Sequence, residues 1–124
     1  MLFNCSTSMK KVYHLSNCGT CKRIITENRL AENGFILQDI KADRIEPAEL
    51  DEMRKLAGSY GALFSKKAIK YKTLGLKDKQ LSEEDYRNYI LEEYTFLKRP
   101  VILAGDRIFA GSDKKTVEDL RSSL

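Results

Sequence analysis

The chain has 124 residues, of which 42% are hydrophobic and 32% are charged, and its net charge is +4. This composition is typical of one folded domain, and no apolar run approaches the roughly 18 residues that span a bilayer. The positive charge is too mild for a dedicated nucleic-acid-binding domain, so we expect neither a membrane nor a direct nucleic-acid partner. We expect residues 1–9, which lack the apolar stretch of a secretion signal, to be a disordered extension before a single domain at 10–124. We also expect the protein to lie in the cytoplasm.

Apolar spacing predicts the elements in chain order. The first part should hold a strand at 10–15, a helix from Gly19 toward a cap at Asn33-Gly34, and a second strand at 35–40. The middle should hold a helix at 47–57 that begins with Pro47, a short helix at 62–71, and a helix from a Ser82 cap to about Tyr94. The last part should hold a strand at 101–103, a return strand at 107–110 after a Gly105-Asp106 turn, and a helix capped by Ser112 that runs through Leu120.

This order of β-α-β, a block of helices, and β-β-α is that of the thioredoxin or glutaredoxin plan. We therefore predict an α/β fold with a mixed four-stranded sheet, flanking helices and a helical insertion at about 46–96.

The sharpest chemical feature is Cys18-Gly19-Thr20-Cys21, which lies where the first strand gives way to the first helix. The unpaired amides and the positive dipole end of a helix start stabilise a thiolate. An ordinary thiol with a pKa near 8.5 is only about 3% ionised at neutral pH. We therefore predict that Cys18 is a nucleophile with a lowered pKa. Cys21 lies one helical turn further on and could resolve a mixed disulfide formed at Cys18.

Other interpretations of the cysteines stay open. The pair could be half of a zinc site completed by Cys5 and His14, or it could be two inert core thiols. Cys5 is best explained as an incidental thiol. His14, at the end of the first strand, could tune the Cys18 thiol or simply pack.

Arg99-Pro100 is the second informative pair, because proline suits the first residue of a buried strand. On the thioredoxin plan this proline is a cis-proline that faces the dithiol. Arg99 would then lie near Cys18, where it could bind an oxyanion or steady a thiolate. The alternative is a surface arginine before a trans-proline.

With these pieces in place, the chain resembles the arsenate reductase (ArsC) family, of the glutaredoxin-linked kind, and also the Spx-type and uncharacterised branches of that family. The likeness runs from Lys10 to about Leu120. Four segments carry it: YHLSNCGTC at 13–21, ALF at 62–64, YKTLGL at 71–76 and LKRPVI at 97–102.

The resemblance implies a reaction in two steps. The Cys18 thiolate attacks arsenate, and glutathione, as co-substrate, then takes the adduct from Cys18. Glutaredoxin or thioredoxin would supply the electrons, and no bound cofactor or metal is implied. Arg99 matches one of the three arginines that build the oxyanion site of the family. The residues implied to contact the substrate are Gly19, Thr20, Lys66 and Pro100.

Two features favour a different branch of the family. The other two oxyanion arginines fall on Ser65 and near Ala110, and a lysine such as Lys66 replaces the charge of arginine but not its bidentate fork. Cys21 matches the two-cysteine switch of Spx-type proteins. The alternative function is therefore a redox-sensing regulator that binds RNA polymerase.

Overall fold

The computed structural model describes residues 10–16 and 18–123. Two compact units make up the chain. The first holds the described residues up to Asp43 and from Arg99 onward, and the second is Arg44–Lys98. None of the helices in the described ranges has the length and apolar character needed to cross a membrane.

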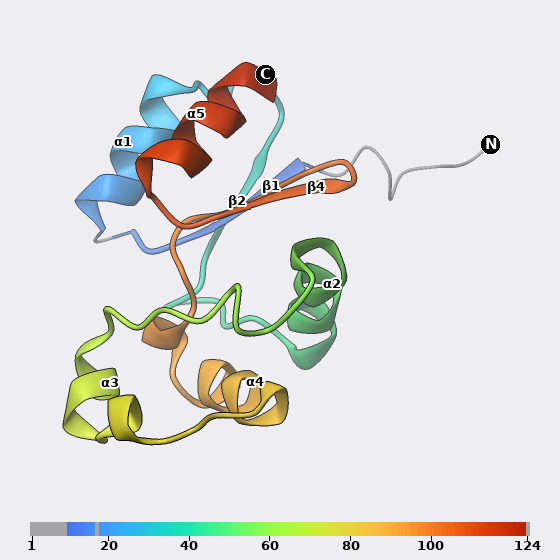
Figure 1. Cartoon of the computed structure of the whole chain (residues 1–124). Coiled ribbons are helices and arrows are strands. Elements are labelled where there is room, and N and C mark those ends of the chain that lie inside the picture. The colour runs from blue at the N-terminus through green and yellow to red at the C-terminus, as the bar shows by residue number, and fades with distance from the viewer. Residues whose placement is uncertain (1–9, 17, 124) are drawn as a thin grey trace. The chain divides into compact units, whose positions relative to one another are not determined.

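The first unit is built on a four-stranded mixed sheet (Figure 1). Its strands are β1 (Lys10–His14), β2 (Ile36–Asp39), β3 (Val101–Ala104) and β4 (Arg107–Ala110). They lie in the order β2-β1-β3-β4, and β1 runs parallel to β2 and antiparallel to β3. The strands β3 and β4 form an antiparallel hairpin whose turn places Gly105 at a φ of 66°, where glycine is favoured. The predicted thioredoxin-like sheet is confirmed.

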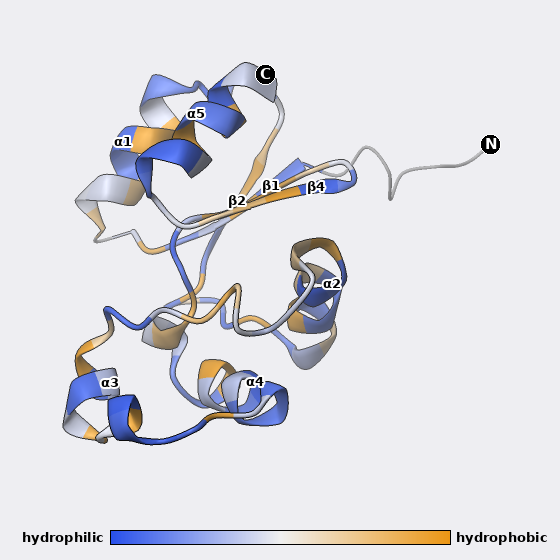
Figure 2. Ribbon diagram, in the orientation of Figure 1, coloured by the Kyte–Doolittle hydropathy of each residue, from blue (hydrophilic) through white to orange (hydrophobic). Residues whose placement is uncertain are grey.

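Helices α1 (Gly19–Glu27) and α5 (Lys114–Ser123) cover one face of this sheet (Figure 1). Strand residues alternate between the two faces of a sheet, so one face collects every second side chain. On the helix-covered face, the buried core joins β1, β3 and β4 to the two helices through Val12, Ile102, Phe109, Ile24 and Leu120. In Figure 2 the sheet shows hydrophobic colour along its strands and hydrophilic colour at some strand ends, and α5 is mostly hydrophilic in colour.

The second unit is helical. It contains α2 (Pro47–Ala57), α3 (Ile69–Thr73), the 3-10 turn η2 (Leu76–Asp78), α4 (Glu83–Glu92) and the 3-10 turn η3 (Tyr94–Phe96). The ring of Phe64 stacks on Phe96 with ring centres 5.0 Å apart and lies 4.8 Å from the ring of Tyr86. Pro47 begins α2, and the predicted Ser82 cap of α4 is confirmed by its hydrogen bond from the Asp85 amide.

The prediction of a helix at 62–71 is wrong, because α3 begins only at Ile69. The backbone before it bonds to a distant part of the chain. The Lys98 amide donates to the Leu63 carbonyl over 2.8 Å, and the Ser65 amide donates to the Phe96 carbonyl over 2.6 Å. These long-range bonds use the groups that a helix would have paired locally.

Helix α1 also ends earlier than predicted, at Glu27. The Asn28 side chain donates to the Ile24 carbonyl over 2.9 Å, and Arg29 takes a φ of 49°, which stops the helical path. Leu30 is nevertheless fully buried, which explains why the apolar spacing continues past the helix end.

Two further helix ends differ from prediction. Ser112 does not cap α5, because the side chain of Asp113 accepts the Thr116 amide over 3.2 Å and the Thr116 hydroxyl over 2.7 Å. Helix α4 ends at Glu92, and Tyr94 opens a separate 3-10 turn.

Candidate active site

Cys18 lies at the junction of β1 and α1, as the N-cap residue of the helix. Its backbone is still extended, with φ −96° and ψ 110°, and its amide donates to the Leu15 carbonyl over 3.1 Å. Its own carbonyl accepts the Lys22 amide over 3.1 Å, which is the first bond of the helix. Cysteine therefore takes the position where serine or aspartate usually accepts the free amides of a helix start.

The thiol of Cys18 is half-buried, and its sulfur accepts the Cys21 amide over 3.4 Å. Burial by itself raises the pKa of this thiol. Hydrogen bonds from the Cys21 amide and thiol, the positive charge of Arg99 and a hydrogen bond from the Thr20 amide act in the opposite direction. Together they outweigh burial and lower the pKa of Cys18 below its ordinary value.

Cys21 has the opposite environment. Its side chain is fully buried on the inner side of α1. Burial is the largest cause that raises the pKa of Cys21, and the hydrogen bond and charge of Cys18 act in the same direction. Against the lowering effect of the Leu15 backbone and of Arg99, they bring the pKa to about 12. The two sulfurs are close enough to share a hydrogen bond, yet the thiolate fraction of Cys18 at neutral pH is far larger than that of Cys21.

Arg99 is half-buried, and its charge acts on both cysteines. The next residue, Pro100, is buried, and the Arg99–Pro100 peptide bond is cis. The Pro100 carbonyl accepts the Gly111 amide over 2.9 Å, which ties the start of β3 to the end of β4. The arginine and the dithiol, more than 75 residues apart in the sequence, thus meet at one end of the sheet.

The sequence reasoning missed a hydrogen-bonded group behind the cysteine loop. The Asp39 carboxylate lies at the end of β2. It accepts hydrogen bonds from the side chain and backbone of Ser16 and from the Lys41 amide. These hydrogen bonds and the charge of His14 lower the pKa of Asp39. His14 pairs with Asp39 in the strand register, and its Nδ1 atom is buried without a hydrogen-bond partner. The signal that could have revealed Asp39 is its place at the carboxyl end of a strand parallel to β1, beside the loop.

The remaining predicted residues fall in different places. Gly19 and Thr20 form the exposed first turn of α1, and a Cβ atom added to Gly19 would meet nothing within 4 Å. Lys66 belongs to the second unit, where it is exposed in the turn before α3, and its contact with substrate stays a prediction. Cys5 lies outside the described residues.

Across 10–16 and 18–123, no three His, Cys, Asp or Glu side chains converge in a way that could hold a metal ion. The arrangement that the described residues do offer is an ionisable sulfur, a buried second thiol and a guanidinium.

Comparisons with known proteins give this arrangement a family. A model of the ArsC family matches residues 13–120. The uncharacterised protein YfgD of Escherichia coli K12 is 28% identical over 121 residues, covering 92% of this chain and 98% of its own. A possible arsenate reductase from Streptococcus mutans is 26% identical with a TM-score of 0.72, covering 91% of this chain and 98% of that one.

An arsenate reductase from Vibrio cholerae has a TM-score of 0.75 and covers 94% of this chain and 99% of its own. At 18% identity, that likeness shows the shared fold alone. The family model, in contrast, spans both cysteines, Arg99 and all four strands but for the first residues of β1. The chain therefore belongs to the ArsC family.

Proposed function

We propose that this protein is a thiol-dependent oxidoreductase that reduces a small, oxidised anionic substrate, with arsenate as the first candidate. The observation that carries the proposal is the unequal pair of neighbouring thiols. Cys18 has a lowered pKa and Cys21 a raised one, so one sulfur is prepared to attack and the other to follow.

With arsenate, the reaction proceeds in two steps. The Cys18 thiolate attacks the arsenic atom, a sulfur–arsenic bond forms, and one oxygen leaves as water after taking up protons. The Cys21 thiolate then attacks the Cys18 sulfur, a disulfide forms, and arsenic departs with the electron pair of the broken bond as arsenite. The two thiols lose two electrons and arsenic(V) gains them.

Arg99 has two functions in this proposal. Its charge already favours the Cys18 thiolate, and the same guanidinium can pair with an anionic substrate held next to that sulfur. The first turn at Gly19 and Thr20, directly after Cys18, is exposed, and space is open where a Gly19 side chain would lie, which supports access of such a substrate.

A reductant must return the disulfide to two thiols. We propose glutaredoxin with glutathione, or thioredoxin, as the electron donor, and a reducing cytoplasm as the setting. Glutathione can also intercept the adduct on Cys18 before Cys21 attacks it, because a thiolate in solution does not carry the burial that raises the pKa of Cys21.

A coupled assay tests the proposal. NADPH consumption is followed with arsenate and with either donor system, using the wild type, Cys18→Ser and Cys5→Ser as a matched thiol control. The expected result is turnover that is lost in Cys18→Ser and kept in Cys5→Ser. Absence of arsenate-dependent turnover with both donors would remove arsenate as the substrate, and unchanged turnover in Cys18→Ser would overturn the proposed nucleophile.

A regulatory function is the second candidate, and the closeness of the two cysteine sulfurs favours it, because such a pair can act as a disulfide switch. In that case the protein would bind RNA polymerase differently in its oxidised and reduced forms. Binding of purified polymerase to each form distinguishes the two functions. Equal or absent binding would leave the enzyme as the remaining candidate.

A further inference from the structure

The surface around Cys18 carries more positive charge than the proposed chemistry requires. Lys22 and Arg23 follow Cys21 directly on α1, and Lys41 follows β2; all three side chains are exposed. From Lys10 to Thr26 the chain contains no aspartate or glutamate. We call Lys22, Arg23 and Lys41 the basic rim.

Two of the three rim residues, Lys22 and Lys41, are tied to the cysteine loop through their backbone amides. The Lys22 amide donates to the Cys18 carbonyl, so Lys22 lies four residues along the helix from Cys18, where side chains share a face. The Lys41 amide donates to the Asp39 carboxylate, which also accepts hydrogen bonds from Ser16. Lys41 is therefore anchored next to the loop that leads to the reactive sulfur.

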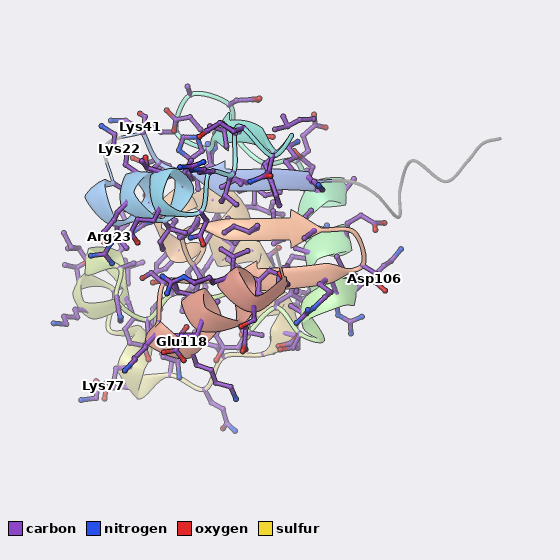
Figure 3. The ribbon with its side chains drawn as sticks, turned by 90° about the horizontal axis from the view of Figure 1, so that it is seen from above. Lys22, Arg23, Lys41, Lys77, Asp106 and Glu118 are labelled. Atoms are coloured by element: carbon purple, nitrogen blue, oxygen red, sulfur yellow. The ribbon has the colours of Figure 1, made fainter. Side chains whose placement is uncertain are left out.

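The rim flanks α1 on two sides. In Figure 3, Lys22 and Lys41 extend on the same side of the helix, and Arg23 extends on the other. None of the ion pairs found among residues 10–16 and 18–123 involves these three cations. Asp39 lies two residues before Lys41, and its carboxylate is already occupied by hydrogen bonds. Glu27 follows Arg23 by one turn of α1 and Asp43 follows Lys41 by two residues, and neither forms an ion pair with the rim among the described residues.

We propose that the basic rim docks the acidic surface of a protein dithiol that reduces the Cys18–Cys21 disulfide. This inference rests on the proposed function and names the surface and the charge of its electron donor. Long, exposed cations on both sides of the helix suit a broad anionic surface better than a small oxyanion. A small oxyanion at the sulfur can instead pair with the guanidinium of Arg99, whose charge acts on both cysteines. Charge complementarity of this kind mainly accelerates association.

The rim would assist reduction of the Cys18–Cys21 disulfide, which takes two thiol–disulfide exchange steps. A thiolate of the partner attacks the Cys18 sulfur, because Cys21 is fully buried. The disulfide breaks, Cys21 leaves and takes up a proton, and a mixed disulfide joins the partner to Cys18. The partner's second thiolate then attacks its own first sulfur, and Cys18 leaves as the thiolate. Two electrons pass from the partner, which becomes a disulfide.

The experiment compares a protein reductant with a small uncharged one. The Cys18–Cys21 disulfide of the full chain, in a Cys5→Ser background, is reduced either by a thioredoxin whose surface around its dithiol is acidic or by dithiothreitol. The rate is measured at about 10 mM and about 1 M salt, where the screening length falls from about 30 Å to about 3 Å. The test variant is Lys22→Glu/Arg23→Glu/Lys41→Glu.

A matched control carries the same change of net charge elsewhere in the first unit. It is Arg29→Glu/Arg107→Glu/Arg121→Glu, three exposed positions. Arg107 begins β4 opposite Ala104, at the sheet end where β1 starts, and Arg121 lies in the last turn of α5. Circular dichroism checks that both variants fold, and Lys22→Gln/Arg23→Gln/Lys41→Gln serves as a milder version of the rim change.

We expect the rim variant to be reduced by thioredoxin about tenfold or more slowly at low salt, with the difference vanishing at high salt. Reduction by dithiothreitol should be unchanged, and the control variant should be affected much less than the rim variant. Equal slowing with both reductants, equal slowing in both variants, or no slowing at low salt would each overturn the proposal. Disulfide reduction is measured without arsenate. The result of this experiment therefore does not depend on whether arsenate is the substrate.

Discussion

Selective alkylation at Cys18 is the most direct consequence of the site. With a pKa of about 12, Cys21 is ionised in only about one molecule in 100,000 at pH 7. The pKa of Cys18 is lowered, and even an ordinary thiol with a pKa near 8.5 is ionised in about 3% of molecules at the same pH. Since the thiolate is the reacting form, we expect iodoacetamide to modify Cys18 at least about 1,000 times faster than Cys21.

The assay measures alkylation rates from pH 5 to pH 10 with peptide mapping by mass spectrometry, in a Cys5→Ser background that removes the third thiol. The midpoint of the Cys18 curve reports its pKa. In Cys21→Ala the midpoint should rise, because the hydrogen bond that the second thiol donates to the Cys18 sulfur is lost. A midpoint for Cys18 at or above that of an ordinary thiol, or comparable rates at both cysteines, would refute the reasoning.

Other predictions concern the charge of Arg99, the Asp113 cap of α5 and the ion pair between Asp51 and Arg87. Arg99→Met should move the alkylation midpoint of the reactive thiol to higher pH and Arg99→Lys should largely restore it, because the charge favours the thiolate; an unmoved midpoint in Arg99→Met contradicts this. Asp113→Ala should lower the free energy of unfolding in urea by about 1 kcal/mol, whereas Ser112→Ala should leave it unchanged, and equal losses would contradict the assignment of the cap. The Arg87 side chain lowers the pKa of Asp51 by hydrogen bonding to it, so this pair stabilises the fold above about pH 4 and loses that effect as pH falls through the lowered pKa. Asp51→Asn should therefore show a smaller loss of stability between pH 5 and pH 2 than the wild type, in acid titrations followed by circular dichroism.

The parts of the molecule that the sequence predicts well are those governed by neighbouring residues. The strand β3 is a short apolar run between a proline and a turn, and Pro47 and Ser82 set their helix starts through local hydrogen-bonding and backbone preferences. The thiolate site belongs to the same class, because its helix-start amides lie within three residues of Cys18.

The errors arise where distant contacts override local preference. The apolar spacing at 62–71 resembles a helix, but the backbone there bonds to Phe96 and Lys98, which the spacing cannot reveal. The spacing of α1 continues to Leu30 because that side chain is buried by a turn and not by a helix. Asp39 was missed for a related reason, since its importance depends on strand pairing with His14.

The different environments of the two thiols also determine how they can act in sequence. In the resting protein, the hydrogen bond and charge of Cys18 add to the burial that raises the pKa of Cys21. Once Cys18 carries a substrate adduct, that thiolate charge is gone, and the pKa of Cys21 should fall. Burial, the largest cause, remains, so Cys21 should still ionise well above neutral pH. The second thiol is thus kept from premature reaction, and its attack should accelerate with rising pH and set the pace of turnover when no external thiol is present.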